Sequence, residues 1–107
     1  MTGSRATAST SDASRLIEAL ALQPHPEGGY YREIHRSPSV VHPADGRGER
    51  SALTVIHFLL PHHGRSRWHV VRSEEQWTWL AGAPLDLFVI DPLSMALRTT
   101  RLGPARS

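Results

Sequence analysis

One histidine and one glutamate have the types and the spacing that chemistry could use. His69 lies in residues 66–71, which we expect to be extended, and Glu75 opens the next extended stretch. An imidazole can donate or accept a proton or bind a metal, and a carboxylate beside it can orient the ring or take the proton. The pair therefore predicts a catalytic site, with His69 as general acid or base and Glu75 as its partner.

Two indoles follow Glu75 at alternate positions. If residues 76–80 form a strand, Glu75, Trp77 and Trp79 share one face, and one register brings that face to His69. Indole rings exclude water from a pocket, so Trp77 and Trp79 are candidate ligand-binding residues. The competing interpretation is that both indoles belong to the core, and that the histidine and the glutamate lie on the surface, as such residues near strand turns usually do.

The strand expected at residues 30–36 supplies a second group of candidates. Tyr30 and Arg32 lie on one face of it and Glu33 on the other. Phenol and guanidinium donors can bind an anionic or hydroxylated ligand, so these three residues are further candidates for ligand binding. The structural alternative is an ion pair of Arg32 with Glu33 or Glu75.

The other histidines carry weaker signals. Those in predicted loops are expected to be solvated surface residues, and they are His25, His42, His62 and His63. His57 falls within the apolar strand expected at 53–60, where a lone histidine is usually a hydrogen-bonded core residue.

The elements that would position these residues are mostly short strands. Period-two patterns between Gly/Pro turns, repeated about every eight to twelve residues, predict an antiparallel sandwich or barrel. The expected strands cover 30–36, 53–60, 66–71, 76–80, 85–90 and 95–101, with a long loop at 37–50. Before them, Asp12 would cap a helix over 13–22 that Pro24 ends. Residues 1–11 predict a disordered tail, so one domain is expected over 12–107.

Composition excludes several classes of function. The chain has no cysteine and no lysine, which removes thiolate chemistry, Schiff-base chemistry and a Walker-type phosphate loop. Its arginines are scattered among acids, with a net charge of +2, so nucleic-acid binding is not expected. No apolar run approaches the ~20 residues that cross a bilayer, and no secretory signal is evident, so the expected location is the cytoplasm.

Four residues match the spacing of the first motif of the cupin superfamily, and they are Gly64, His69, Glu75 and Gly82. More specific matches are Leu-Gln-Pro-His-Pro-Glu-Gly-Gly-Tyr-Tyr-Arg-Glu at 22–33, the leucine pair at 59–60, and residues 66–87. Through these segments the chain resembles the cupin group DUF985 (cupin_5) over residues 14–103. The resemblance implies an all-β, RmlC-like jelly-roll barrel with a short N-terminal helix, frequently dimeric, with a pocket inside the barrel mouth.

Two departures from the cupin pattern bear on the cofactor. Metal-binding cupins usually hold the ion with three histidines and a glutamate, but only His69 and Glu75 match, and Val71 stands where many have their second histidine. The sequence also ends before the second cupin motif, so the barrel is expected to be incomplete. A divalent transition metal bound by His69 and Glu75 would have only two of the usual four ligands, so it stays one alternative and the cofactor is left open.

Three functions remain open. The first is a small-molecule protein, an isomerase or epimerase-like enzyme or a binding protein for a sugar-like or anionic ligand, using His69 and Glu75. The second is a metal-dependent cupin enzyme completed by a partner subunit, and the third is a non-catalytic binding module or truncated remnant. The expected partners are a small-molecule ligand and a second copy of the chain, as a homodimer, with no nucleic acid and no membrane.

Overall fold

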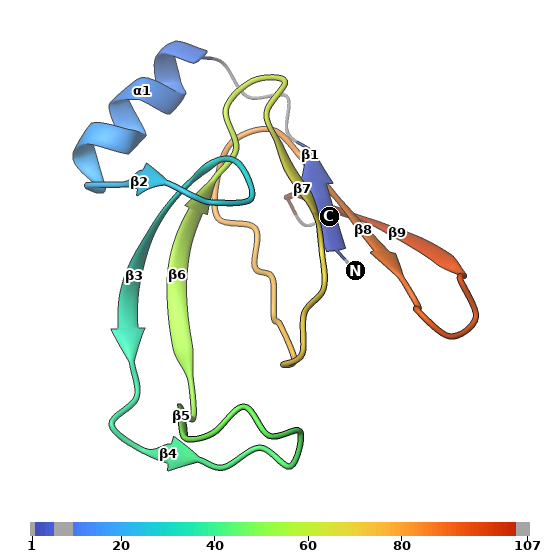
Figure 1. Cartoon of the computed structure of the whole chain (residues 1–107). Coiled ribbons are helices and arrows are strands. Elements are labelled where there is room, and N and C mark those ends of the chain that lie inside the picture. The colour runs from blue at the N-terminus through green and yellow to red at the C-terminus, as the bar shows by residue number, and fades with distance from the viewer. Residues whose placement is uncertain (1, 6–9, 105–107) are drawn as a thin grey trace.

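The computed structural model describes residues 2–5 and 10–104, which form antiparallel sheets and one short helix (Figure 1). The elements in chain order are β1 (Thr2–Arg5), α1 (Thr10–Ala19), β2 (Gln23–Pro24), β3 (Tyr30–Arg36), β4 (Val40–Val41), β5 (Arg50–Ser51), β6 (Thr54–Leu59), β7 (Arg65–His69), β8 (Leu85–Ile90) and β9 (Leu97–Leu102). Within this described part, α1 is too short and too polar to cross a bilayer, and it is the sole helix.

The strands form two main sheets and a small ribbon. One sheet has the order β7-β1-β8-β9, the second has the order β2-β3-β6, and β4 pairs with β5. In Figure 1 the long β3–β6 pair and the β8–β9 hairpin lie on opposite sides of the molecule. The sheets do not close on each other, since β6 and β9 each pair with only one described strand. The prediction of an all-β fold with a short N-terminal helix is confirmed, in the form of an incomplete barrel.

Several predicted strands coincide with observed ones because their patterns are clear. β3 and β8 have the predicted bounds, and β6 and β7 lie within the predicted ranges except that β7 begins one residue early. The strand predicted over 76–80 is wrong, because these residues pair with no described strand. The indole N–H of Trp79 instead donates to the carbonyl of Ala83 (3.2 Å), a bond within the same segment. A local bond of this kind curls the chain and does not extend a ladder.

The N-terminal part also differs from expectation. α1 begins before Asp12, which therefore lies in its first turn and does not cap it. Residues 2–5 were expected in a tail but form β1, between β7 and β8. A ladder uses backbone groups, which small polar residues supply as well as apolar ones do. The remainder of the expected tail, at residues 1 and 6–9, lies outside the described residues.

The core is small for a chain of this length. Within residues 12–104 only Ala13, Leu22, Leu60 and Ser66 are buried. The predicted buried strand β6 is open, since Val55 and Ile56 are 39% and 42% exposed. The accessible surface is 8078 Å², whereas a folded monomer of this mass typically exposes about 6,000 Å². Much apolar surface is therefore left uncovered.

A tight turn joins β2 to β3 and docks on the start of β7. The His25 N–H donates to the Gly29 carbonyl (2.9 Å), and the Arg67 N–H donates to the Glu27 carbonyl (2.6 Å). Gly28 and Gly29 have φ of +112° and +78°, in the region that favours glycine. A Cβ on Gly29 would lie 2.7 Å from the Leu59 carbonyl oxygen, so the backbones approach more closely than a side chain permits.

Candidate functional site

A central groove runs between β6 and the irregular segment that precedes β8. Its volume is about 970 Å³, and it is lined by residues 53–60 and 73–83 with Asp12, Ala13, Leu16 and Leu85. In Figure 1 the chain after β7 descends to a turn and then climbs back toward β8. Glu75, Trp77 and Trp79 line this groove together with all their neighbours in 73–83, although no strand aligns them, whereas His69, which the sequence placed in the same pocket, does not line it.

The loop between β3 and β6 holds the start of that segment in place. The Arg47 guanidinium donates to the Ser73 hydroxyl (2.8 Å) and bonds the Asp45 carboxylate (2.7 Å). The bond from Arg47 to Ser73 joins residues 26 positions apart, and Ser73 is two residues before Glu75. The loop predicted at 37–50 thus contains a small ribbon, β4–β5, and supports the base of the groove.

His69 ends β7 in a defined orientation. Its ring is partly buried, and its Nδ1 lies 2.8 Å from the Arg67 carbonyl oxygen. A carbonyl oxygen only accepts, so Nδ1 carries the proton and the neutral ring has its lone pair on Nε2. The bond that orients this imidazole comes from the backbone, whereas the sequence suggested Glu75 for that part.

His25 lies in the β2–β3 turn and is held by two aromatic rings and one hydrogen bond. Its ring centroid is 4.9 Å from that of Tyr31 and 5.4 Å from that of Phe58, both edge-on. The Glu27 N–H donates to its Nδ1 (3.0 Å). Its partly buried ring does not match the solvated surface histidine that the sequence predicted.

Burial and several charged groups act on the pKa of His25. Burial lowers the pKa of this imidazole, the Glu27 and Glu75 carboxylates oppose the shift, and His69 adds to it. His69 and Glu75 are therefore both close enough to His25 for their charges to act on it. Neither imidazole lines the groove, but Phe58 does, and its ring is 5.7 Å from that of Trp77. The ring contacts His25–Phe58 and Phe58–Trp77 connect His25 to the part of the groove that Glu75 and Trp77 line.

The second group of candidates separates onto two faces of β3. Tyr31 lies opposite Phe58 in the ladder, so the two share the face that His25 contacts. Tyr30 and Arg32 alternate with Tyr31 and point to the other face, opposite Leu59 and His57.

Glu33, on the same face of β3 as Tyr31, bonds the Arg36 guanidinium (2.8 Å). Within residues 10–104 no ion pair joins Arg32 to Glu33 or Glu75. The structure brings Tyr31, which the sequence did not single out, into contact with His25.

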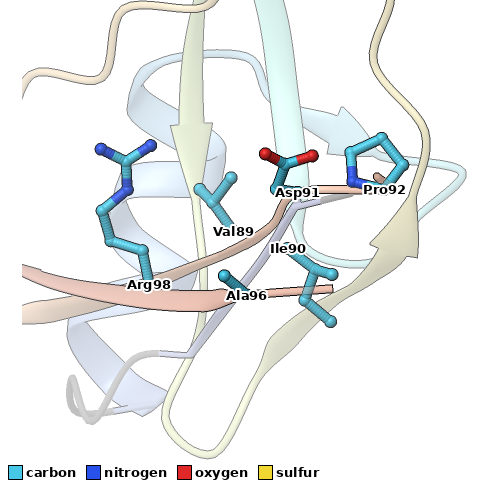
Figure 2. Close-up of a pocket in the computed structure, with 6 residues that line it drawn as sticks. All are labelled: Val89, Ile90, Asp91, Pro92, Ala96 and Arg98. Atoms are coloured by element: carbon cyan, nitrogen blue, oxygen red, sulfur yellow. The ribbon is translucent and has the colours of Figure 1, made fainter. Parts of the chain in front are cut away.

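A second depression lies at the β8–β9 turn, shown in Figure 2. It has a volume of about 530 Å³ and is lined by Val89, Ile90, Asp91, Pro92, Ala96 and Arg98. Its one carboxylate, Asp91, accepts the Leu93 N–H (2.9 Å), and this bond lowers its pKa. The carboxylate thus shapes its own turn, and the depression holds no histidine with which it could share a proton.

The donor set for a metal is incomplete. Among the described residues, no three His, Asp or Glu side chains are grouped so that they could hold an ion. The two candidate ligands, His69 and Glu75, fall short of the three protein ligands that catalytic metal sites usually have. The residues present therefore do not fit a metal centre.

A protein-family model described as cupin superfamily (DUF985) matches residues 14–107. The chain belongs to this cupin family. No curated protein and no solved structure is significantly similar to this cupin. The family assignment agrees with the resemblance seen in the sequence and with the strand-rich, unclosed fold. In this cupin the motif residues His69 and Glu75 come from the end of β7 and from the irregular segment that follows it.

His25 was missed for a physical reason, although the sequence held a signal for it. A histidine between two prolines and before two glycines sits in a turn with little conformational freedom, which fixes the position of its side chain. Whether a turn side chain meets solvent or protein depends on where the turn docks, which no local pattern reveals.

Protonation of His25 is expected to oppose folding. Its pKa in the folded chain lies below 6.5, so between that lowered pKa and 6.5 the unfolded chain binds more protons. The contribution of the neutral His25 ring to the free energy of unfolding is then fully present above pH 6.5, and it is lost as the pH falls through this window. The charged groups acting on the ring are Glu27, Glu75 and His69. Urea unfolding from pH 7.5 to 5 should show a steeper loss for the wild type than for His25→Asn, and equal slopes would contradict the assignment.

Proposed function

We propose that this cupin binds a small polar molecule at the Glu75–Trp77 end of the central groove and transfers a proton on it through His69. The observation that carries the proposal is the bond from His69 Nδ1–H to the Arg67 carbonyl, which directs the basic lone pair to Nε2. His25 adds to the support, because the charges of both His69 and Glu75 act on its imidazole. Sugar-nucleotide epimerases of the wider cupin group use a histidine beside a carbonyl, which is an analogy of fold.

The chemistry proposed is reversible removal of a proton from carbon. His69 Nε2 takes a proton from a carbon next to a carbonyl group, and returns it to the same or the opposite face. Glu75 stabilises the imidazolium while it carries the proton. Trp77 and Trp79 flank the ligand and exclude water from it. Tyr31 is the ligand-binding tyrosine, in place of Tyr30, which the sequence suggested. Arg32 and Glu33 are not required.

Exchange of hydrogen with solvent tests this function directly. The protein is incubated in D₂O with fructose, with fructose phosphates, with nucleoside-diphosphate 4-keto sugars and with 2-oxo acids, and loss of the proton signals beside the carbonyl is followed by NMR. We expect at least one compound to exchange faster than in buffer. No exchange across the whole panel would reject the enzyme and favour a binding module.

A further inference from the structure

The two imidazoles of the site are held by hydrogen bonds of opposite sense. Nδ1 of His25 accepts the Glu27 N–H at 3.0 Å, whereas Nδ1 of His69 donates to the Arg67 carbonyl at 2.8 Å. A backbone amide can only donate and a carbonyl can only accept, so both assignments follow from the partners. The neutral His25 ring therefore has its hydrogen on Nε2, and the neutral His69 ring has its lone pair there.

We propose that His25 is a further ligand-binding residue of the site, which donates its Nε2–H to the carbonyl oxygen whose neighbouring carbon gives a proton to His69. This assignment rests on the proposed function and narrows its ligands to carbonyl compounds that carry a C–H bond on the adjacent carbon. One histidine is a fixed donor and the other is a fixed acceptor. A carbonyl compound complements both, because its oxygen accepts a hydrogen bond and the C–H bond on the adjacent carbon gives a proton.

The step balances without any co-reactant. The C–H bond breaks, its proton goes to Nε2 of His69, and its electron pair forms the carbon–carbon double bond of an enolate. The charge gathers on the former carbonyl oxygen, where the Nε2–H of His25 stabilises it. Return of the proton to carbon restores both rings and the carbonyl group.

Three observations favour a donor role for His25. Its ring is fixed between Tyr31 and Phe58, so the donor direction is set before a ligand arrives. A second proton on the His25 ring would lie on Nδ1 and face the Glu27 N–H, so that two donors would point at each other; this contact therefore favours the neutral ring. Burial also lowers the pKa of His25, which favours the neutral ring as well. Within residues 10–104 no protein group bonds its Nε2. A neutral donor also avoids a second cation beside the His69 imidazolium.

The competing explanation is that His25 only shapes its turn. That role needs only the Nδ1 bond to the Glu27 N–H, and an asparagine oxygen can accept the N–H two residues on in the same way. His25→Asn therefore keeps the turn and removes the Nε2 donor. A structural role predicts that this variant equals the wild type, and a donor role predicts that it does not.

Nitrogen-15 NMR of the wild type at pH 7.5 tests the tautomers without any ligand. Long-range proton–nitrogen correlations separate the protonated ring nitrogen from the lone-pair nitrogen, and His25→Asn and His69→Gln each remove one ring for assignment. We expect the hydrogen on Nε2 of His25 and on Nδ1 of His69. The same tautomer in both rings would overturn the inference, even if hydrogen exchange were observed.

The exchange reaction tests the donor itself. With whichever panel compound exchanges, His25→Asn is expected to lose about 10²–10³-fold in kcat, the effect typical of removing one oxyanion donor. The variant's melting temperature serves as the check that the turn is intact. A well-folded variant with wild-type kcat would reduce His25 to a turn residue. If no compound exchanges, the proposed function fails, and the tautomers decide the donor assignment separately.

Discussion

Replacing His69 with glutamine is expected to lower the rate of solvent exchange by about 10²–10⁴-fold, the usual contribution of a positioned general base. Glutamine has a similar reach and can hydrogen-bond, but it has no basic lone pair at pH 7. Because His69 is partly buried at the end of β7 and its Nδ1 bonds a backbone carbonyl of the same strand, the fold should survive the change. The measurement is the rate of deuterium uptake at saturating ligand, beside a thermal melt.

His42→Gln provides the matched control for this substitution. His42 is exposed in the long loop, where its Nε2 lies 3.3 Å from the Glu49 carboxylate, and it does not line the central groove. The control should retain wild-type exchange within about twofold, since a surface substitution away from the site usually changes little. Loss of exchange in both variants, or in neither, would contradict the assignment of His69 as the general base.

Gly29→Ala is expected to be strongly destabilising, costing about 2–5 kcal/mol. Two effects add up. A left-handed backbone costs alanine about 1–2 kcal/mol, and overpacking typically costs a further 1–3 kcal/mol or more. The new Cβ would lie 2.7 Å from the Leu59 oxygen and 2.8 Å from Leu60 Cδ2, which is one of the few buried side chains. Urea unfolding at constant pH measures the loss.

Gly48→Ala separates the two causes. Its φ of +79° matches the +78° of Gly29, but nothing lies within 4 Å of the Cβ position. The backbone strain is therefore the same and the overlap is absent, so we expect a loss of only about 1–2 kcal/mol. Equal losses in the two variants would show that the β2–β3 turn is not packed against β6 as described.

Strands with a clear pattern could be predicted from the sequence, and others could not. β3 and β8 combine alternating or apolar residues with flanking Gly and Pro, so their local signals agree with their tertiary pairing. β1 has no such pattern, because its place depends on partners far along the chain. Residues 76–80 have a strand-like composition, but no neighbouring strand pairs with them. Propensity describes a segment, whereas a ladder needs two segments.

The candidate site, like the strands, could be predicted from the sequence only in part. His69 and Glu75 stand out through their spacing, and the structure places Glu75 with both indoles on the groove. His25 and Tyr31 enter the site only because the β2–β3 turn docks on β7 and faces Phe58. That docking is a contact between segments about forty residues apart, as the bond from Arg67 to Glu27 shows. Spacing within one segment cannot indicate it.

The outer edge of β6 has a consequence for how the protein behaves in solution. This strand presents unpaired backbone groups and half-exposed apolar side chains, and it also forms one wall of the groove. We propose that a second copy of the chain covers it, because an open strand edge flanked by exposed apolar side chains such as Val55 and Ile56 favours pairing with another chain. Folding and self-association would then be linked by mass action, so dilution would lower both the melting temperature and the affinity of the groove for its ligand.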